Sequence, residues 1–350
     1  MKKIGLLTAA VLLAAACLFA GCAKTEAKSD YEEGVKELKA GDYEAAGTSF
    51  SRTVEAGEFL AEAYRGEGLS YMCQSDYADA CIAFEKSLLN IENQSADFTK
   101  DVNLYLAYCR TRHSETDKAM EIYNSLLKKE TDPEVLFLRG RLFMQTGDET
   151  SAKTDFDKAA SLSTDYNLFI NIYEIYDSCG KDADGADYLE QALNLANQSA
   201  SDYYNKGLVN YYLENYSEAK DNLIKAIQEN GKDSGAILLL GKVYLSMDDT
   251  ADARAMFKEH ISDKDSAAAA YNGLALCDMA DGSYDSALSN VQSGLALDDE
   301  SANQSLRFNE IVIYEHQHDW STAKTKAAAY VGYYPTDEMG LRENEFLSSR

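Results

Sequence analysis

The sequence contains few residues whose types and spacing suit catalysis or metal binding. The best candidate for a calcium loop is the segment 180–185, Gly-Lys-Asp-Ala-Asp-Gly, where Asp182 and Asp184 offer two carboxylates. A calcium loop also needs an acidic first ligand and a bidentate glutamate at its twelfth position, and this sequence has Gly180 and Gln191 there. We therefore predict a polar turn at residues 180–185 and no calcium site.

The four histidines do not form a metal-binding pattern. His316 and His318 are two residues apart, and side chains with that spacing on a helix point to different sides. His113 and His260 have no residues of ligand type nearby in the sequence. The sequence also lacks a glycine-rich phosphate loop, a Gly-x-Ser-x-Gly elbow and a His-Glu-x-x-His motif. We expect no metal, no cofactor and no enzymatic activity.

The cysteines resemble core residues more than a disulfide framework. Besides Cys17 and Cys22 the sequence has an odd number of them and no Cys-x-x-Cys motif: Cys73, Cys81, Cys109, Cys179 and Cys277. We interpret these five as structural thiols that behave as small apolar side chains. The alternative is a disulfide between Cys73 and Cys81, which an oxidising compartment would permit.

Composition sets the class of protein and of partner. The chain has 350 residues, 45% of them hydrophobic, and only two prolines, so it can bury a large core with few helix breakers. Its formal net charge is -26. Nucleic acid is an unlikely partner for so acidic a chain because a phosphate backbone requires a basic surface to replace its counterions.

The first residues have the organisation of a secretion signal. Lys2 and Lys3 form a charged start, residues 4–19 are apolar, and Leu-Phe-Ala-Gly-Cys follows at 18–22. This segment resembles a bacterial lipobox, with Phe19 where leucine is usual. The resemblance implies a signal peptide at residues 1–21 and a lipid on Cys22. The alternatives are modification at Cys17, a plain secretion signal or an uncleaved anchor.

A lipid on Cys22 has consequences for location. Residues 22–29 would form the lipidated cysteine and a short tether, since residues 23–29 show no apolar periodicity. The protein would then be held on a bacterial membrane, facing the periplasm or the cell exterior.

A repeated unit of about 34 residues organises the rest of the chain. Residues 200–233 contain two helical patterns of apolar residues, with small residues at Gly207 and Ala219 and a turn near Asn215. The order of small, aromatic and alanine positions resembles the tetratricopeptide repeat. The same pattern begins at nine positions: Ala27, Ala61, Lys100, Pro133, Tyr166, Ala200, Ser234, Ala268 and Gln304.

The second helix of every repeat has a small residue at one fixed position. The nine residues are Ala46, Ala80, Ala119, Ala152, Gly185, Ala219, Ala253, Ala287 and Ala323. We predict an all-α tandem helix-turn-helix solenoid of about nine repeats over residues 27–337. The family resemblance implies a right-handed superhelix whose first helices line a concave face. A polar tail, residues 338–350, either caps the last helix or frays.

The resemblance also suggests where a partner binds. In repeats six and seven the family geometry turns an apolar strip with a few polar groups toward the groove: Tyr204, Asn205, Tyr211, Tyr212, Leu238, Lys242 and Leu245. This composition suits a protein or peptide partner. Partial burial at a repeat junction is the alternative for each tyrosine. The next candidate is the surface around Tyr105, Tyr108 and Phe137.

Two other binding modes receive less support. Some family members hold the terminal carboxylate of a chaperone with a Lys and Asn clamp, but the corresponding positions here lack the cations, and scattered Arg65, Arg141 and Lys242 do not rebuild it. Glycan-binding lipoproteins with such repeats use long insertions and often tryptophan, whereas this chain has regular steps and only Trp320. We expect a membrane-anchored scaffold for protein–protein interaction, with solute or glycan binding as the alternative.

Overall fold

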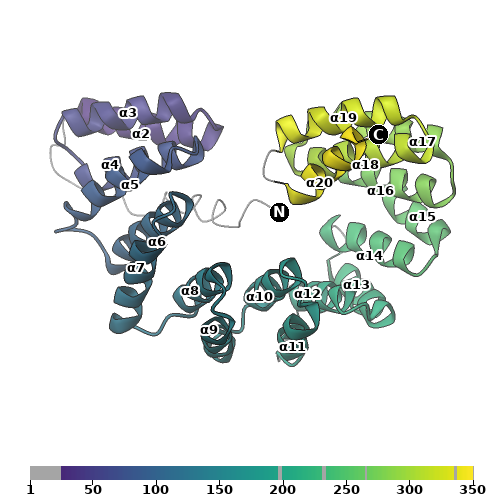
Figure 1. Cartoon of the computed structure of the whole chain (residues 1–350), viewed down its shortest axis with the longest axis horizontal. Helices are drawn as coiled ribbons and strands as arrows, with labels where there is room; N and C mark the ends of the chain where they lie inside the picture. The colour runs from purple at the N-terminus through teal and green to yellow at the C-terminus, as the bar shows by residue number, and fades with distance from the viewer. Residues whose placement is uncertain (1–24, 196–198, 231–233, 265, 335–336, 350) are drawn as a thin grey trace. The chain divides into compact units, whose positions relative to one another are not determined.

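The computed structural model describes residues 25–195, 199–230, 234–264, 266–334 and 337–349. Every regular element in these ranges is an α-helix (Figure 1). The chain divides into two compact units, 1–175 and 176–350, and the boundary falls within α10. The predicted signal peptide, which includes Cys17, and the predicted lipid site Cys22 lie outside the described residues.

The first unit contains the helix pairs of repeats one to four. Its helices are α2 (Thr25–Ala40), α3 (Tyr43–Glu55), α4 (Leu60–Cys73), α5 (Tyr77–Leu88), α6 (Ala96–Arg112), α7 (Thr116–Lys129), α8 (Pro133–Thr146), α9 (Glu149–Leu162) and most of α10 (Tyr166–Ser178). Residues 25–29, which the sequence assigns to the tether, are helical because α2 already begins at Thr25. Ala27 is buried in this helix.

The second unit contains the pairs of repeats six to nine and two further helices. Its helices are α11 (Asp182–Leu193), α12 (Ala200–Tyr212), α13 (Tyr216–Glu229), α14 (Ser234–Ser246), α15 (Thr250–His260), α16 (Ala267–Ala280), α17 (Tyr284–Leu295), α18 (Glu300–His316), α19 (Trp320–Tyr333) and α20 (Glu338–Ser348). Successive helices pack against each other from α2 to α9 in the first unit and from α11 to α20 in the second, as expected for stacked repeats.

The turns within repeats combine a left-handed residue with a capping aspartate. The left-handed residue ends the first helix, and the aspartate that follows accepts a hydrogen bond from the backbone N–H three residues later at 3.1–3.2 Å. Five turns are built this way: Gly41-Asp42, Ser75-Asp76, Gly147-Asp148, Asp248-Asp249 and His318-Asp319. The prediction of a helix stop followed by an N-cap is confirmed.

The small residues of the second helices lie at the centre of the packing. All eight alanines at this position are completely buried, and Gly185 is buried as well. The nine-fold pattern in the sequence therefore identifies the crossing point of each helix pair, and the predicted all-α tandem repeat fold is confirmed.

The glycines of the first helices make room for a large side chain. A Cβ added to Gly207 would lie 2.6 Å from Leu223 Cγ, and one added to Gly140 would lie 2.6 Å from the ring of Phe156. Real Cβ atoms do not approach other atoms so closely. The close approach predicted at Gly207 is therefore mainly to the side chain of Leu223, four residues after Ala219. The backbone oxygen of Ala219 lies 3.4 Å from the same added Cβ.

Two of these large side chains also contact the following repeat. The ring of Phe50 fills the space beside Gly34 in α2 and beside Gly66 in α4. The ring of Phe257 lies in the same way between Gly241 in α14 and Gly273 in α16. A single ring thus packs against the backbones of two successive first helices.

Repeat nine fills the same space with the sizes exchanged. Ile311 stands at the first-helix position that holds glycine or alanine in seven other repeats, and Ala327 stands where the other repeats have a large apolar residue. Both are completely buried in one cluster with Ala323. The large and the small residue have changed helices.

The C-terminal segment caps the stack. Residues 338–348 form α20, whose Leu347 is buried in the cluster formed with α19. Gly340 lies directly against the ring of Tyr330, whose hydroxyl donates a hydrogen bond of 2.9 Å to Asp337. Of the two alternatives for the tail, the structure has the cap.

Replacement of Gly66 by alanine tests the contact between ring and backbone. The new Cβ would lie 2.6 Å from the Phe50 ring, so we expect Gly66→Ala to lower the free energy of unfolding by about 1–3 kcal/mol. Gly332→Ala in α19 is the control because nothing lies within 4 Å of its added Cβ, and there we expect a gain of about 0.5–1 kcal/mol. Chemical denaturation followed by circular dichroism measures both.

The double variant Gly66→Ala with Phe50→Leu provides a second check. The smaller, more flexible leucine should recover part of the lost stability if the clash with the ring is the cause. Equal stability of Gly66→Ala and wild type would refute this account of the packing.

Candidate partner-binding surfaces

The three predicted tyrosines of α12 are half-buried. Tyr204 and Tyr211 pack against the buried cluster that α13 and α14 share, which includes Leu223 and Leu240. The ring of Tyr211 also lies 6.2 Å from that of Tyr212, edge to face. These rings therefore serve the repeat junction, as the alternative from the sequence proposed, and still leave part of their surface open to solvent.

The predicted leucines of α14 belong to a different cluster. Leu238 and Leu245 are half-buried against α15 and α16, where Phe257 and Leu274 form the core. Lys242 is exposed between them in the sequence, and Asn205 on α12 is half-buried. The structure thus brings the seven predicted residues onto neighbouring first helices, but their apolar members pack into two successive junctions.

The second surface predicted from the sequence contains one core residue and two half-buried residues. Tyr105 is buried, and its ring stacks on Phe84 with 5.6 Å between centroids, so it is a core residue. Tyr108 on α6 and Phe137 on α8 are half-buried and remain candidates for contact with a partner.

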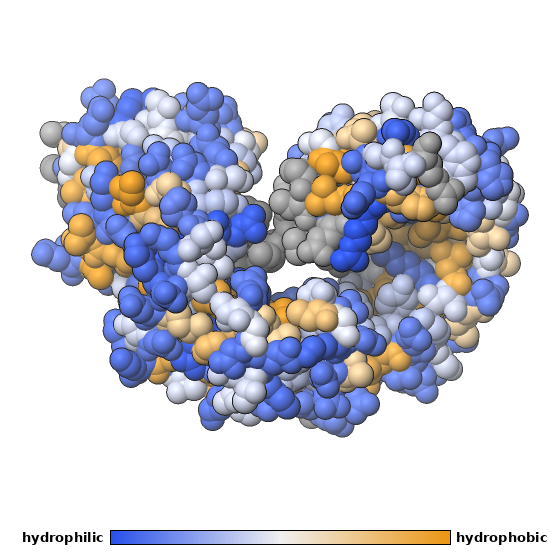
Figure 2. Space-filling model, viewed as in Figure 1, coloured by the Kyte–Doolittle hydropathy of each residue, from blue (hydrophilic) through white to orange (hydrophobic). Residues whose placement is uncertain are grey.

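The surface itself shows no single large apolar region on the face in view. Figure 2 shows hydrophilic residues over most of this face, with apolar residues in small separate patches. Within the described residues, no helix combines the length and the apolar character that crossing a bilayer requires.

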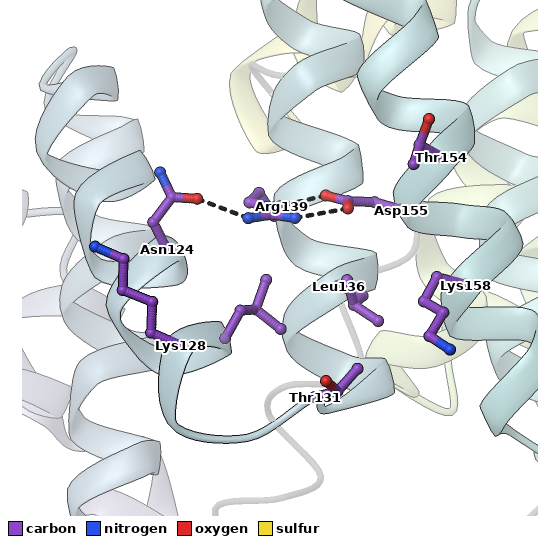
Figure 3. A pocket seen from close by; sticks show the side chains of 9 residues that line it. Asn124, Lys128, Thr131, Leu136, Arg139, Thr154, Asp155 and Lys158 are labelled. Atoms are coloured by element: carbon purple, nitrogen blue, oxygen red, sulfur yellow. Dashed lines mark hydrogen bonds and ion pairs between the residues drawn. The ribbon is translucent and has the colours of Figure 1, made fainter.

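An open pocket of about 520 Å³ lies between α7, α8 and α9 (Figure 3). Arg139 points into it and donates two hydrogen bonds of 2.7 Å to the buried carboxylate of Asp155 and a third of 2.6 Å to Asn124 Oδ1. The guanidinium is satisfied by these partners, and its bidentate geometry is the strongest form of such an ion pair. We interpret Arg139 as a brace between three helices.

Two similar buried pairs occur in the second unit. Asp278 accepts hydrogen bonds from Arg254 at 2.6 Å and Asn290 at 2.7 Å, and Lys326 donates one of 2.8 Å to the buried Glu310. One member of each pair follows the small residue of the second helix by three positions: Asp155, Asn290 and Lys326. Sequence reasoning missed these pairs, and the offset alone does not reveal them, because other repeats have Ala83, Ile122 or Tyr188 at the same position.

The residues first considered as metal ligands lie in turns or in packing contacts between helices. Gly180 has a left-handed backbone with φ of 68° and lies in the turn before α11, but the helix begins at Asp182, so the turn predicted for residues 180–185 covers only residues 180–181. The His316 ring stacks on Tyr284 at 5.2 Å, whereas His318 is in the turn before α19. Among the described residues there is no group of three potential metal ligands.

The five internal cysteines, all of them among the described residues, form no disulfide in the structure. Cys109 and Cys277 are completely buried, which confirms their prediction as core residues. A hydrogen bond with Cys81, together with burial, raises the pKa of the Cys109 thiol. The neighbour of Cys81 is thus Cys109 on α6, and the structure does not join Cys81 to Cys73.

Comparison with known proteins identifies the repeats. Tetratricopeptide repeat family models match residues 31–97, 101–132, 133–166 and 212–277. A curated relative, the TPR repeat-containing protein MJ1428 of Methanocaldococcus jannaschii, is 24% identical over 229 residues. The match covers 61% of this chain and spans only 39% of that relative's length.

Solved structures with similarity include three tetratricopeptide or related proteins. A tetratricopeptide repeat protein from Parabacteroides merdae is 18% identical with a TM-score of 0.45, covering 81% of this chain and 99% of its own. Yeast Tom70 is 15% identical with a TM-score of 0.43, covering 93% and 89%. YrrB, described as a TPR protein with an unusual peptide-binding site, is 21% identical with a TM-score of 0.34, covering 54% and 97%.

The four matched segments together span more than half of the sequence and coincide with the helix pairs described above. The chain belongs to the tetratricopeptide repeat family, whose repeats form scaffolds for protein–protein interaction.

Proposed function

We propose that this protein is a lipid-anchored, non-catalytic adaptor that works outside the cytoplasm and binds a protein partner on α12 and α14. The scaffold role follows from the repeat family. The anchor, the compartment and the binding surface are the additional parts of the proposal.

The N-terminal sequence supports the anchor. Two lysines, an apolar stretch at 4–19 and small residues before Cys22 are the features that a lipoprotein signal requires. A single acyl chain binds a membrane only marginally, so stable anchoring requires the two chains of a diacylglyceryl group or more. Cys22 is the residue that would carry it.

The observation that favours α12 and α14 is the arrangement of half-exposed tyrosines next to an exposed lysine. Tyr204, Tyr211 and Tyr212 offer rigid aromatic surface with a hydroxyl at the edge, and Lys242 adds a positive charge on the next first helix. Aromatic anchors of this type dominate the binding energy of protein interfaces. Their partial burial holds the rings in place before a partner arrives, which lowers the entropic cost of binding.

A double substitution tests the surface. Tyr204→Ala with Tyr211→Ala should weaken partner capture by at least about 2 kcal/mol, equivalent to roughly thirtyfold in affinity. Because both rings contact the core, we also expect each substitution to cost about 1–2 kcal/mol of folding stability. Crosslinking in intact cells, followed by a quantitative pull-down, measures capture, and a thermal melt measures stability.

The matched control replaces two tyrosines that pack on the same cluster. Tyr203→Ala with Tyr244→Ala removes similar half-buried rings from the same core, and neither residue is among the seven proposed for the surface. Equal loss of capture in both double variants would show that instability alone is responsible, and unaffected capture by the first pair would place the binding surface elsewhere.

Substitution of the proposed lipid site tests the anchor. Cys22→Ala should abolish incorporation of a labelled fatty acid and leave either an unprocessed precursor or protein released from the membrane. Cys17→Ala is the control and should be labelled and retained like wild type. Normal labelling and membrane retention of Cys22→Ala would disprove lipidation at this residue, and loss of label in Cys17→Ala alone would assign the lipid to Cys17.

A further inference from the structure

Two cysteines from neighbouring repeats belong to one buried cluster. Cys81 lies on α5, the second helix of repeat two, and is 7% exposed. Cys109 lies on α6, the first helix of repeat three, and is completely buried. The cluster that contains both cysteines also includes the rings of Phe84 and Tyr105. Two thiols in such a cluster either pack as small apolar groups or form a disulfide.

Two ring contacts establish how α5 and α6 face each other. Tyr77 at the start of α5 meets Tyr108 edge to face, with 6.2 Å between the ring centroids. Two turns later on α5, Phe84 stacks on Tyr105 with 5.6 Å between centroids. Later residues of α5 therefore meet earlier residues of α6, and the two helices run antiparallel.

Cys81 lies between these two contacts on α5. It follows Tyr77 by four residues and precedes Phe84 by three, so its side chain shares their face of the helix. Cys109 follows Tyr105 by four residues and shares the corresponding face of α6. The spacing and the ring contacts thus bring the two thiols to the same level of the interface between the helices.

The two thiols differ in acidity. The hydrogen bond between them lowers the pKa of Cys81 and, together with burial, raises the pKa of Cys109. Arg110, which forms an ion pair across the interface with Glu85 on α5, also lowers the pKa of Cys81. The more exposed thiol is therefore also the more acidic one, which makes Cys81 the nucleophile of the pair.

The equivalent junction in the second unit has one thiol only. Cys277 occupies the place of Cys109 in its own repeat, two residues after the small residue of the first helix, and is also completely buried. The position of Cys81, directly after the small residue of the preceding second helix, is held there by Arg254. Burial raises the pKa of Cys277 to about 11. Cys277 is thus an internal control for a buried thiol without a second one opposite.

We propose that Cys81 and Cys109 form a disulfide, which joins α5 to α6, when the protein meets a disulfide-bonded oxidant. The extracytoplasmic location proposed above would supply such an oxidant, either a thiol–disulfide oxidoreductase or a small disulfide. The experiment below adds the oxidant to purified protein and does not depend on that location. For these two residues, the proposal replaces the structural thiols expected from the sequence.

The reaction is a thiol–disulfide exchange in two steps. The Cys81 thiolate attacks one sulfur of the oxidant, which forms a mixed disulfide and releases the other sulfur as a thiolate. Cys109 then loses its proton and attacks Cys81 Sγ, which forms the internal disulfide and releases the second thiolate. The two cysteines lose two protons and two electrons, and the oxidant is reduced to two thiols. Only Cys81 has to meet the oxidant, so the complete burial of Cys109 does not prevent the second step.

Peptide mapping of the purified full chain tests the link. Reduced protein is incubated with oxidised glutathione, and the remaining thiols are alkylated in denaturant. Trypsin alone would leave Cys73 and Cys81 together on residues 66–86, so a second protease that cleaves before aspartate is added to separate them. Mass spectrometry of the digest then identifies every disulfide by its two peptides.

The expected disulfide joins residues 79–86 to residues 101–110, which contain Cys81 and Cys109. Cys277 should be recovered in its alkylated form. A parallel sample is refolded from urea with the oxidant present, so that burial does not limit access to either thiol. The same pair should be linked in both samples.

Three variants and a stability measurement assign the link. Cys81→Ala and Cys109→Ala should each abolish it, whereas Cys73→Ala should retain it. A crosslink restricts the unfolded chain, so oxidised wild type should unfold at a urea concentration about 1 M higher than reduced wild type. The oxidised and reduced forms of Cys81→Ala should unfold at the same concentration.

Two results would overturn the proposal. One is recovery of both Cys81 and Cys109 as alkylated thiols from the native and the refolded samples, which would return them to the role of core residues. The other is a disulfide from Cys73 to either of them as the main product, which would show that the structure's pairing is not the one that oxidation selects.

Discussion

The fold depends on a large side chain that packs against the backbones of two first helices at once. Phe50 and Phe257 show the contact most clearly, because glycines of successive repeats line both sides of each ring. Each dispersion contact between the ring and the neighbouring backbone is weak, but together these contacts are large. The ring belongs to one repeat and also contacts the next. A repeat therefore cannot complete its core alone, and stability arises from stacking.

Polar braces complete the packing around this apolar centre. Asp155, Asp278 and Glu310 are buried carboxylates, and each is met by a cation from a neighbouring helix. A buried ion pair contributes little net stability, but the loss of one partner is costly because the other charge remains buried. These pairs therefore specify how the helices sit in register, while the apolar contacts supply the driving force.

The sequence predicted the helices, the turns and the crossing points well because each depends on local spacing. Small residues such as Gly207 and Ala219 occur at fixed positions in the repeats. An aspartate after a left-handed residue caps the helix that directly follows it. The sequence did not predict which surface contacts are satisfied. The pairing of Arg139 with Asp155 and the separation of Leu238 from Tyr204 into another junction both depend on residues from other helices. The predicted tether differs from the structure for a similar reason, since Ala27 becomes helical and buried through contacts beyond its own segment.

The exchange in repeat nine shows what the repeat conserves. Ile311 and Ala327 each violate the pattern of their own position, yet together they supply one large and one small side chain to the same buried cluster. In this repeat one large and one small side chain remain at two positions sixteen residues apart, and which of the two positions carries the large one is secondary. A profile that scores each position independently penalises such a repeat twice, whereas one that scores the pair jointly would recognise it. Covariation between these two positions is therefore the natural signature for finding divergent units at the edges of an array.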